Sequence, residues 1–262
     1  MIEKQRNRCN FRQKYFFVKL LEKSMFTSTD FSKYFTTAFS VDNVIFGFDD
    51  ADIKILLIRR GLERQRSIYQ DMWALPGDLV NPDEDLDGAA YRVLDELTGL
   101  KNVYLEQVKA FGAVHRHPVG RVITVSYFSL IKISDYEVMP NSFAERAEWY
   151  TIKDARQLTL AFDHSKIVET CFNALKQRIR VAPIGFELLP PKFTLTELQQ
   201  LYESILERTL EKRNFRKKIL GMNFIVDLKE SQERVAHRPA RLYEFNQAKY
   251  ENLVAKGFSF EL

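Results

Sequence analysis

The C-terminal part of the sequence follows a break at residues 182–185, where a proline and a glycine interrupt the preceding helical pattern. It opens with Thr194 and Glu197 at the spacing of a capping box, ahead of leucine and isoleucine residues at helical intervals. The elements that follow are one further helix and two strand-like runs, at 211–220, 224–228 and 241–245. Two helices and a hairpin in this order form a winged helix-turn-helix, which we predict for residues 187–262.

The second of these helices has five basic residues in its ten positions, 211–220. Its cations share a broad face, whereas Phe215 and Ile219 form an apolar stripe that can pack against the first helix. Arginine and asparagine can pair with base edges, and lysine mainly reaches phosphate. The candidate DNA-binding residues of this helix are Lys212, Arg213, Asn214, Arg216, Lys217 and Lys218. A second basic group, in the expected wing loop, consists of Arg234, His237, Arg238 and Arg241.

The charge of the chain is unevenly distributed. Residues 1–24 contain seven basic and two acidic residues, a net charge of +5, so the rest of the chain carries −1 of the total of +4. Binding of nucleic acid by the folded part must then depend on a local patch. A basic helix is also typical of a solvated surface or of a module that binds an acidic protein, and both alternatives stay open at this point.

The basic segment forms most of an N-terminal extension at residues 1–38. We expect this extension to be disordered, with a DNA-binding arm as the alternative. Met25 is an alternative start of the protein, in which case residues 1–24 are not part of it.

Residues 39–182 mix strand-like and helical patterns, which predicts an α/β domain with a mixed sheet and packed helices. The expected strands cover 40–48, 53–59, 103–114, 121–133 and 147–152, and the expected helices cover 86–97 and 165–179. In the first of these helices the apolar residues form one stripe, and Gly99 follows at the position of a C-terminal cap.

Residues 77–100 resemble the Nudix box. In that family a glycine is followed after five residues by glutamate, and after seven more by Arg-Glu-x-x-Glu-Glu-x-Gly. Asp78 replaces the opening glycine here, and Val93 and Leu97 replace two of the glutamates. The residues of this degenerate box are Gly77, Asp78, Glu84, Arg92, Val93, Glu96 and Leu97.

The missing carboxylates have a chemical consequence. Nudix hydrolases use carboxylates on this helix to bind Mg²⁺, which needs several oxygen ligands in octahedral geometry. Only Glu84 and Glu96 remain, and Val93 and Leu97 extend the apolar stripe of the helix. Metal-assisted attack on phosphorus would lack its template, so we expect no catalysis, no metal site and no cofactor. The alternative is an active pyrophosphohydrolase with relocated metal ligands.

Three C-terminal segments, 193–199, 212–217 and 238–243, resemble the winged helix of the Nudix-related transcriptional regulators of the NrtR and AraR group. Together with the degenerate box, this resemblance covers residues 39–245. It implies a ligand-responsive regulator whose Nudix half binds an ADP-ribose-type nucleotide or a pentose, and whose homodimer binds palindromic operator DNA.

The effector pocket is expected near the former active site. In the segment 115–122, His115 and His117 stand where the family usually has aspartates. The candidate ligand-binding residues are Arg59, Arg121, Trp149, Asp163 and His164, because a polar and aromatic pocket suits either a sugar face or a purine. Loss of the metal ligands directed at phosphate favours a sugar over a nucleotide diphosphate.

The chain contains two cysteines, Cys9 and Cys171, in no spacing typical of a zinc site or a disulfide framework. Its apolar stretches are shorter than the roughly 18 residues that a membrane span needs. We therefore expect a cytoplasmic protein with no membrane partner.

Overall fold

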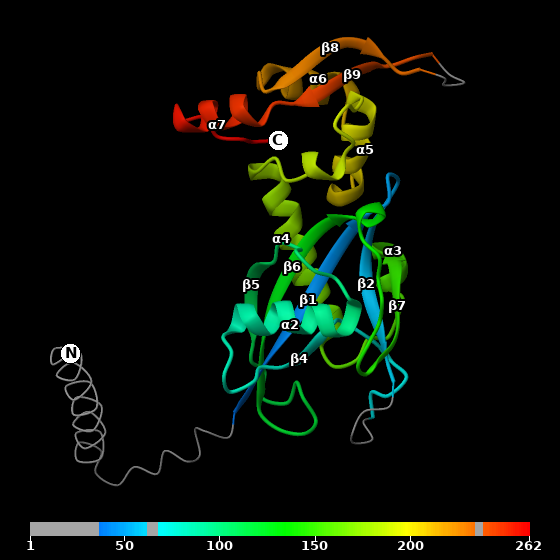
Figure 1. The fold of residues 1–262 in the computed structure, drawn as a ribbon, viewed down its shortest axis with the longest axis vertical. Coiled ribbons are helices and arrows are strands. Elements are labelled where there is room, and N and C mark those ends of the chain that lie inside the picture. The colour runs from blue at the N-terminus through cyan, green and yellow to red at the C-terminus, as the bar shows by residue number, and fades with distance from the viewer. Residues whose placement is uncertain (1–36, 62–67, 234–237) are drawn as a thin grey trace, which may run out of the picture. The chain divides into compact units, whose positions relative to one another are not determined.

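The computed structural model describes residues 37–61, 68–233 and 238–262 (Figure 1). The N-terminal extension expected over residues 1–38 therefore lies almost entirely outside the described residues, and so do Arg234 and His237. Residues from Ala38 to Leu262 form one compact unit. None of the helices in the described ranges is both long and apolar enough to cross a membrane.

A seven-stranded mixed sheet forms the centre of the first domain. Its strands are β1 (Ala38–Phe48), β2 (Ile53–Arg60), β3 (Trp73–Ala74), β4 (Gly77–Leu79), β5 (Glu106–Phe111), β6 (Val122–Lys132) and β7 (Ala144–Thr151). The main order is β3-β2-β1-β6-β5, with β4 paired to β1 and β7 paired to β2. The long central pair, β1 and β6, is parallel, and the other pairs are antiparallel.

Strand β1 is buried on both of its faces, and its second half, from Val44 to Phe48, is apolar. Val41 and Ile45 belong to a core cluster with helix α2 (Leu86–Thr98). Val44 and Phe46 belong to a second cluster with helix α4 (His164–Val181). Figure 1 shows α2 and α4 in cyan and yellow-green beside the sheet. The expected α/β architecture is thus present, with one helix on each side of the central strands.

Helix α2 follows its sequence signals closely. Asp85 is the N-cap and accepts a hydrogen bond from the Gly88 N–H at 2.7 Å. Gly99 ends the helix in the left-handed conformation, at φ 73°, as expected for a C-terminal glycine. Helix α4 begins one residue before and ends two residues after the expected 165–179.

The strand expected over residues 103–114 is wrong in extent, because β5 covers only Glu106–Phe111. Val103 and Leu105 are apolar because they belong to a loop that packs in the core cluster under α2, and they are not strand residues. Short elements complete the domain: the 3-10 turn η2 (Ile133–Asp135), α3 (Ile152–Ala155) and the 3-10 turn η3 (Phe186–Leu188).

The C-terminal domain has the expected order of elements. They are α5 (Leu195–Leu206), α6 (Lys212–Gly221), β8 (Ile225–Ser231), β9 (Arg241–Phe245) and α7 (Gln247–Ala255). Both halves of the capping box are formed, because Thr194 Oγ1 accepts from the Glu197 N–H and Glu197 accepts from the Thr194 N–H. The sequence did not predict helix α7, because its apolar residues do not form a stripe and none of its residues is buried.

The two domains meet at a tightly packed junction. A Cβ added at Gly185 would lie 3.2 Å from Leu201 and 3.3 Å from Ile179, so the backbone there touches side chains of both domains. Leu262 also lies at this junction, because its N–H donates to the carbonyl of Arg180, near the end of α4, at 2.9 Å. A single apolar cluster runs from α4 into the winged helix.

Candidate functional site

A cavity of about 670 Å³ lies in the first domain, between β1, β4 and the loop ahead of β6. Its polar lining comes from Ser40, Asp42, Arg60, Asp78, Arg116, Ser142 and His164. Its aromatic lining comes from His117, Phe143 and Phe162. This volume lies in the range of small-molecule sites, and the lining combines cations, one buried carboxylate and flat rings.

The buried carboxylate is Asp42, on β1. It accepts a hydrogen bond from Thr124 Oγ1 at 2.7 Å, and His164 Nε2 lies 3.3 Å from its Oδ1. The Leu75 N–H donates to His164 Nδ1 at 2.9 Å, so Nδ1 is an acceptor and Nε2 carries the hydrogen that faces Asp42. Burial opposes ionisation of Asp42, but His164, Thr124 and Arg116 outweigh it and lower the pKa of this carboxyl.

Arg116 forms the second part of the cavity floor. Its side chain is only 3% exposed and makes two contacts with Asp163, Nη2 to Oδ1 at 2.7 Å and Nε to Oδ2 at 3.1 Å. The same Nη2 lies 3.6 Å from Asp42 Oδ2. Asp163 is the residue directly before α4, so this pair joins the loop that carries Arg116 to the start of that helix.

An aromatic group forms the opposite wall. The His117 ring stacks on the Phe162 ring with centroids 5.0 Å apart and 12° between the planes. The Arg60 guanidinium lies over the Phe162 ring at 4.9 Å and over the Phe143 ring at 5.3 Å. Burial, with the charges of Arg116 and Arg60, lowers the pKa of His117, so its ring is uncharged at neutral pH.

Phe162 has an unusual backbone conformation, with φ at 53° in the left-handed region. A bulky side chain adopts this region only where its surroundings hold it. Here the ring contacts His117, Arg60 and Tyr69, whose ring centroid lies 4.2 Å away. The fold thus fixes this ring at the cavity, directly ahead of α4.

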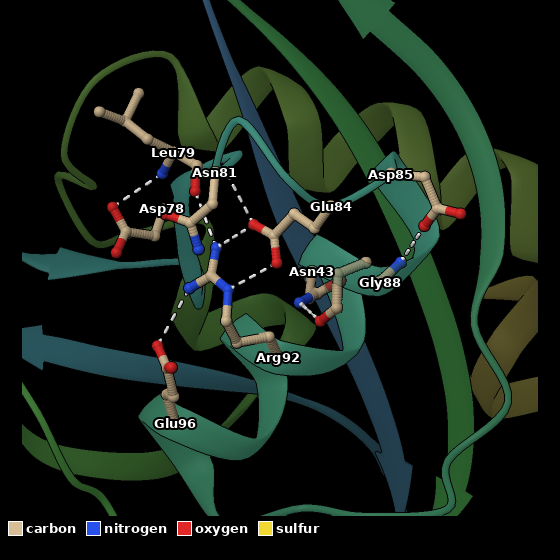
Figure 2. Close-up of polar contacts among 10 residues, drawn as sticks. Asn43, Asp78, Leu79, Asn81, Glu84, Asp85, Gly88, Arg92 and Glu96 are labelled. Atoms are coloured by element: carbon tan, nitrogen blue, oxygen red, sulfur yellow. Dashed lines mark hydrogen bonds and ion pairs between the residues drawn. The ribbon is translucent and has the colours of Figure 1, made fainter. Parts of the chain in front are cut away.

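The degenerate box lies beside the cavity, and its remaining charges are paired internally (Figure 2). Arg92 donates to Glu84 through Nε at 2.9 Å and Nη2 at 2.6 Å, and through Nη1 to Glu96 at 3.0 Å. The Asn81 N–H also donates to Glu84 at 2.7 Å. The Arg92 hydrogen bonds, with that of Asn81, lower the pKa of Glu84 to about 2.

The donors of the box do not fit the Mg²⁺ site of the Nudix family. Val93 and Leu97 are 0% and 1% exposed and pack in the core under α2. The two retained carboxylates point to Arg92, as Figure 2 shows. In the part of the chain that the structure describes, no group of three or more His, Cys, Asp or Glu side chains is placed to hold a metal ion.

Gly77, the first residue of the box, is required by close packing. A Cβ at this position would lie 2.0 Å from Asp42 Oδ1 and 2.9 Å from the Val41 carbonyl oxygen. The neighbouring Asp78 lines the cavity and accepts the Leu79 N–H at 2.7 Å. Gly77 therefore allows β4 to approach the buried carboxylate.

The structure brings together only part of the expected pocket. His164 lines the cavity, and Asp163 holds Arg116 at its floor. Arg59, Arg121 and Trp149 do not line it. The pairing of β2 with β7 shifts register between Arg59 and Arg60, and Arg60 is the one that lines the cavity.

Arg121 and Trp149 are engaged elsewhere. Arg121 Nη1 donates to the Gly112 carbonyl at 2.6 Å. The Trp149 ring covers Gly47, and an added Cβ there would lie 2.6 Å from it. Gly47 is five residues along β1 from Asp42, a separation of roughly 17 Å. Arg60 was missed because the register shift of β2 at this residue has no signal in the sequence. Arg116 and Phe162 were missed because long-range contacts leave no local signal.

The basic face of α6 forms a second candidate site. Phe215 and Ile219 are buried against α5, as expected. The residues exposed on the other side are Lys212, Arg213, Asn214, Lys217 and Lys218. Arg216 is half-buried, and its Nη2 donates to Thr196 Oγ1 on α5 at 3.2 Å. Glu211 caps α6 by accepting the N–H groups of Arg213 and Asn214.

The wing hairpin carries two of its expected cations within the described residues. Arg238 is exposed, and Arg241 lies 3.1 Å from Asp227 on the paired strand. Arg234 and His237 lie in the short segment outside those residues. The exposed cations are therefore concentrated on α6, whereas in the described part of the wing Arg238 is exposed and Arg241 is paired with Asp227.

Comparison with known proteins identifies the same two domains, a Nudix domain and a winged helix. Residues 36–171 match the NUDIX domain family, and residues 185–245 match the NrtR DNA-binding winged helix domain. A relative from Acinetobacter baylyi, the ADPR responsive transcriptional repressor NtrR, is 38% identical over 222 residues, which are 84% of this chain and 86% of the relative.

Two solved structures of Shewanella oneidensis NrtR are also similar. The complex with a 27mer DNA is 28% identical with a TM-score of 0.62, covering 79% of this chain and 93% of that one. The NUDIX domain complexed with ADP ribose is 27% identical with a TM-score of 0.50, covering 56% of this chain and 94% of that one. The chain therefore belongs to the NrtR-type family, in which a Nudix domain precedes an NrtR winged helix domain.

Proposed function

We propose that this protein is a transcriptional repressor that binds operator DNA through α6 and the wing, and that ADP-ribose binding in the Nudix cavity changes its affinity for the operator. The observation that carries the proposal is the exposed cationic face of α6, in a chain that is 38% identical to an ADPR responsive repressor. We propose that the effector-sensing Nudix domain covers residues 39–182 and the DNA-binding winged helix covers residues 187–262, after a basic N-terminal extension.

The chemistry of α6 suits a helix in the major groove. Its apolar side anchors it to α5, so the exposed side can face DNA without loss of packing. Arg213 and Asn214 lie in its first turn, the part of a recognition helix that reaches base edges. Lys217 and Lys218, one turn later, are suited to phosphate. Arg238 and Arg241 add positive charge from the wing.

We propose that the repressor acts as a homodimer in the cytoplasm. Winged-helix and related regulators bind two half-sites related by a two-fold axis, and a symmetric protein matches a palindromic operator. Effector binding would then act by changing the relative placement of the two copies of α6, since the duplex fixes the spacing of the half-sites.

The cavity favours ADP-ribose over the simple sugar expected from the sequence. A nucleotide with a diphosphate needs a cation and a flat ring at the same site, and Arg60 and Phe162 provide both. The relatives also favour this effector, because one is named for its response to ADPR and another is solved with ADP ribose bound.

We propose that this domain does not hydrolyse its ligand. The box has two carboxylates, both held by Arg92, and two buried apolar side chains in place of the others. The alternative, a Nudix hydrolase with relocated metal ligands, predicts Mg²⁺-dependent cleavage of ADP-ribose to AMP and ribose 5-phosphate. Product analysis by chromatography after long incubation with Mg²⁺ distinguishes the two.

The test uses the full chain. Selection from random DNA duplexes by the purified protein yields the preferred site, and fluorescence anisotropy then measures its affinity with and without ADP-ribose. We expect a palindromic site, affinity that falls steeply with salt, and a change in affinity on addition of ADP-ribose but not of ribose or arabinose. Equal affinity for all duplexes, or no response to ADP-ribose, contradicts the proposal.

A further inference from the structure

A group of charged side chains connects the cavity domain to the turn that precedes α6. Glu207 ends α5 in the left-handed conformation, with φ at 50°. It pairs with Arg156, which follows α3, and with Lys176 of α4, whose Nζ lies 2.5 Å from Glu207 Oε2. Arg156 also pairs with Glu169 of α4 at 2.7 Å. We call Arg156, Glu169, Lys176 and Glu207 the Glu207 latch.

The cations of the latch are held in place on the cavity domain. The Arg156 guanidinium lies 5.6 Å from the centroid of the Phe172 ring, and Lys176 Nζ lies 4.4 Å from it. Phe172 is fully buried in α4, so it offers a rigid base for both charges. Burial alone would raise the pKa of Glu207, but its hydrogen bonds with Arg156 and Lys176 lower it. Glu207 therefore stays ionised at neutral pH.

The other side of the latch is rigidly joined to the DNA-binding helix. Only the short segment 208–211 separates Glu207 from the start of α6. Glu203 fixes this turn, because its Oε1 accepts the Leu210 N–H at 2.7 Å and the Gln199 amide at 2.9 Å. Glu211 then caps α6. A displacement of Glu207 is thus passed to α6 rather than absorbed by a loose loop.

Helix α4 joins the latch to the cavity. Its first residue, His164, contacts Asp42 and Leu75 at the cavity, and Asp163 before it holds Arg116. Lys176 lies about three turns further along. Figure 1 shows α4 running from the sheet toward the C-terminal domain. A ligand that moves Arg116 or Phe162 displaces the start of the helix whose later turns hold Glu207.

We propose that the Glu207 latch is the coupling element that passes the state of the effector cavity to α6, through α4, and that it contributes little to binding of either ligand. This inference rests on the proposed function and assigns it a regulatory contact. Exposed pairs stabilise a fold only weakly, and the apolar junction at Gly185 holds the domains together without them. Loss of the latch should therefore remove the effect of ADP-ribose on operator affinity and leave folding intact.

The test compares Glu207→Gln and Arg156→Met with the parent and with Glu187→Gln, which removes an exposed carboxylate from the junction outside the latch. Calorimetry measures ADP-ribose affinity, and anisotropy measures affinity for the selected operator with and without saturating ADP-ribose. Allosteric couplings of about 5- to 150-fold are typical, and we expect such a response from the parent and Glu187→Gln. In Glu207→Gln the change in operator affinity caused by ADP-ribose should fall below about threefold. The affinity for ADP-ribose and the affinity for the operator without ADP-ribose should both stay as in the parent.

Further results decide the proposal. Arg156→Met keeps the Lys176 pair and should show a partial loss, and adding it to Glu207→Gln should cause no further loss, since both remove one network. A full response in Glu207→Gln overturns the inference, and so does loss of operator binding by both variants without ADP-ribose, which would make the contact purely structural. A parent that ignores ADP-ribose contradicts instead the proposed function.

Discussion

Arg92 and Glu84 form a two-pronged ion pair in which Nε and Nη2 of the guanidinium reach both oxygens of the carboxylate, at 2.9 and 2.6 Å. The arginine is thereby fixed between the loop and the helix of the degenerate box, and it also donates to the Leu79 carbonyl at 2.9 Å. A carboxylate held in this way supports the loop beside the cavity. Glu84 is therefore a structural contact between this loop and α2.

This pair predicts a specific dependence of stability on pH. The pKa of Glu84 is about 2 in the fold and 4.5 ordinarily, so its stabilising effect is complete above pH 4.5 and is lost as pH falls toward 2. Arg92→Leu should therefore reduce the free energy of unfolding at pH 6, and the difference from the parent should shrink as pH falls from 4.5 to 2. Urea titrations at pH 6 and pH 3 measure this, and a difference that is constant with pH contradicts it.

The apolar replacements on α2 give a second prediction. Val93→Glu puts an unpaired carboxylate at a position that is fully buried in the core. We expect the free energy of unfolding to fall by at least about 2 kcal/mol, without any gain of ADP-ribose hydrolysis. Glu96→Gln, on the exposed side of the same helix, should change it by less than about 0.5 kcal/mol. Urea denaturation measures both. A stable Val93→Glu variant that hydrolyses ADP-ribose would show that a catalytic site survives.

Local signals in the sequence predicted the elements well. The capping box at Thr194, the cap at Gly99 and the stripe of α2 each depend on residues within a few positions, and the structure confirms all three. The two apolar residues of α6 were placed correctly for the same reason. Helix α7 lacked such a stripe and was therefore missed.

The sequence indicated only part of the cavity lining, because the residues of the cavity meet only through the fold. Arg116 and Asp163 are far apart in the sequence, and so are Asp42 of β1 and His164 of α4, which lie in contact. An aromatic ring such as that of Trp149 is as typical of a core as of a ligand site, and Trp149 packs against the core cluster under α2. The choice between Arg59 and Arg60 depends on a register shift of β2 between these two residues, which the sequence does not reveal.

The neighbouring arginines of β2 give a sharp test of the cavity. Arg60→Met removes the guanidinium beside Phe162 and should weaken ADP-ribose binding by about 10- to 100-fold, the effect of a lost hydrogen bond to a charged group. Arg59→Met, the matched control, removes the same charge from the adjacent position outside the cavity and should leave affinity within about threefold. Calorimetry measures both, and equal losses would show that only the net charge matters.

The lysines of α6 should act through phosphate. Lys217→Ala should weaken binding to operator and to unrelated duplexes to the same extent, because a phosphate contact is independent of sequence. The slope of log K against log salt concentration should become shallower by about 1. Arg213→Ala should instead weaken the operator selectively, by about 1–3 kcal/mol. Anisotropy at several salt concentrations separates these effects, and an equal loss on both kinds of DNA for Arg213→Ala contradicts its role in reading bases.

The contact between Gly77 and Asp42 gives the last prediction. A methyl group at Gly77 would lie 2.0 Å from the Asp42 carboxylate, which is itself held by Thr124 and His164 and cannot turn away freely. Gly77→Ala should therefore lower the free energy of unfolding by about 1–3 kcal/mol and displace the cavity floor, weakening ADP-ribose binding. Gly120→Ala adds the same methyl group where nothing lies within 4 Å, and it should change neither quantity. Thermal unfolding with and without ADP-ribose tests both variants. A Gly77→Ala protein as stable and as responsive as the parent would mean that β4 can move away from β1, and that Asp42 does not fix the shape of the site.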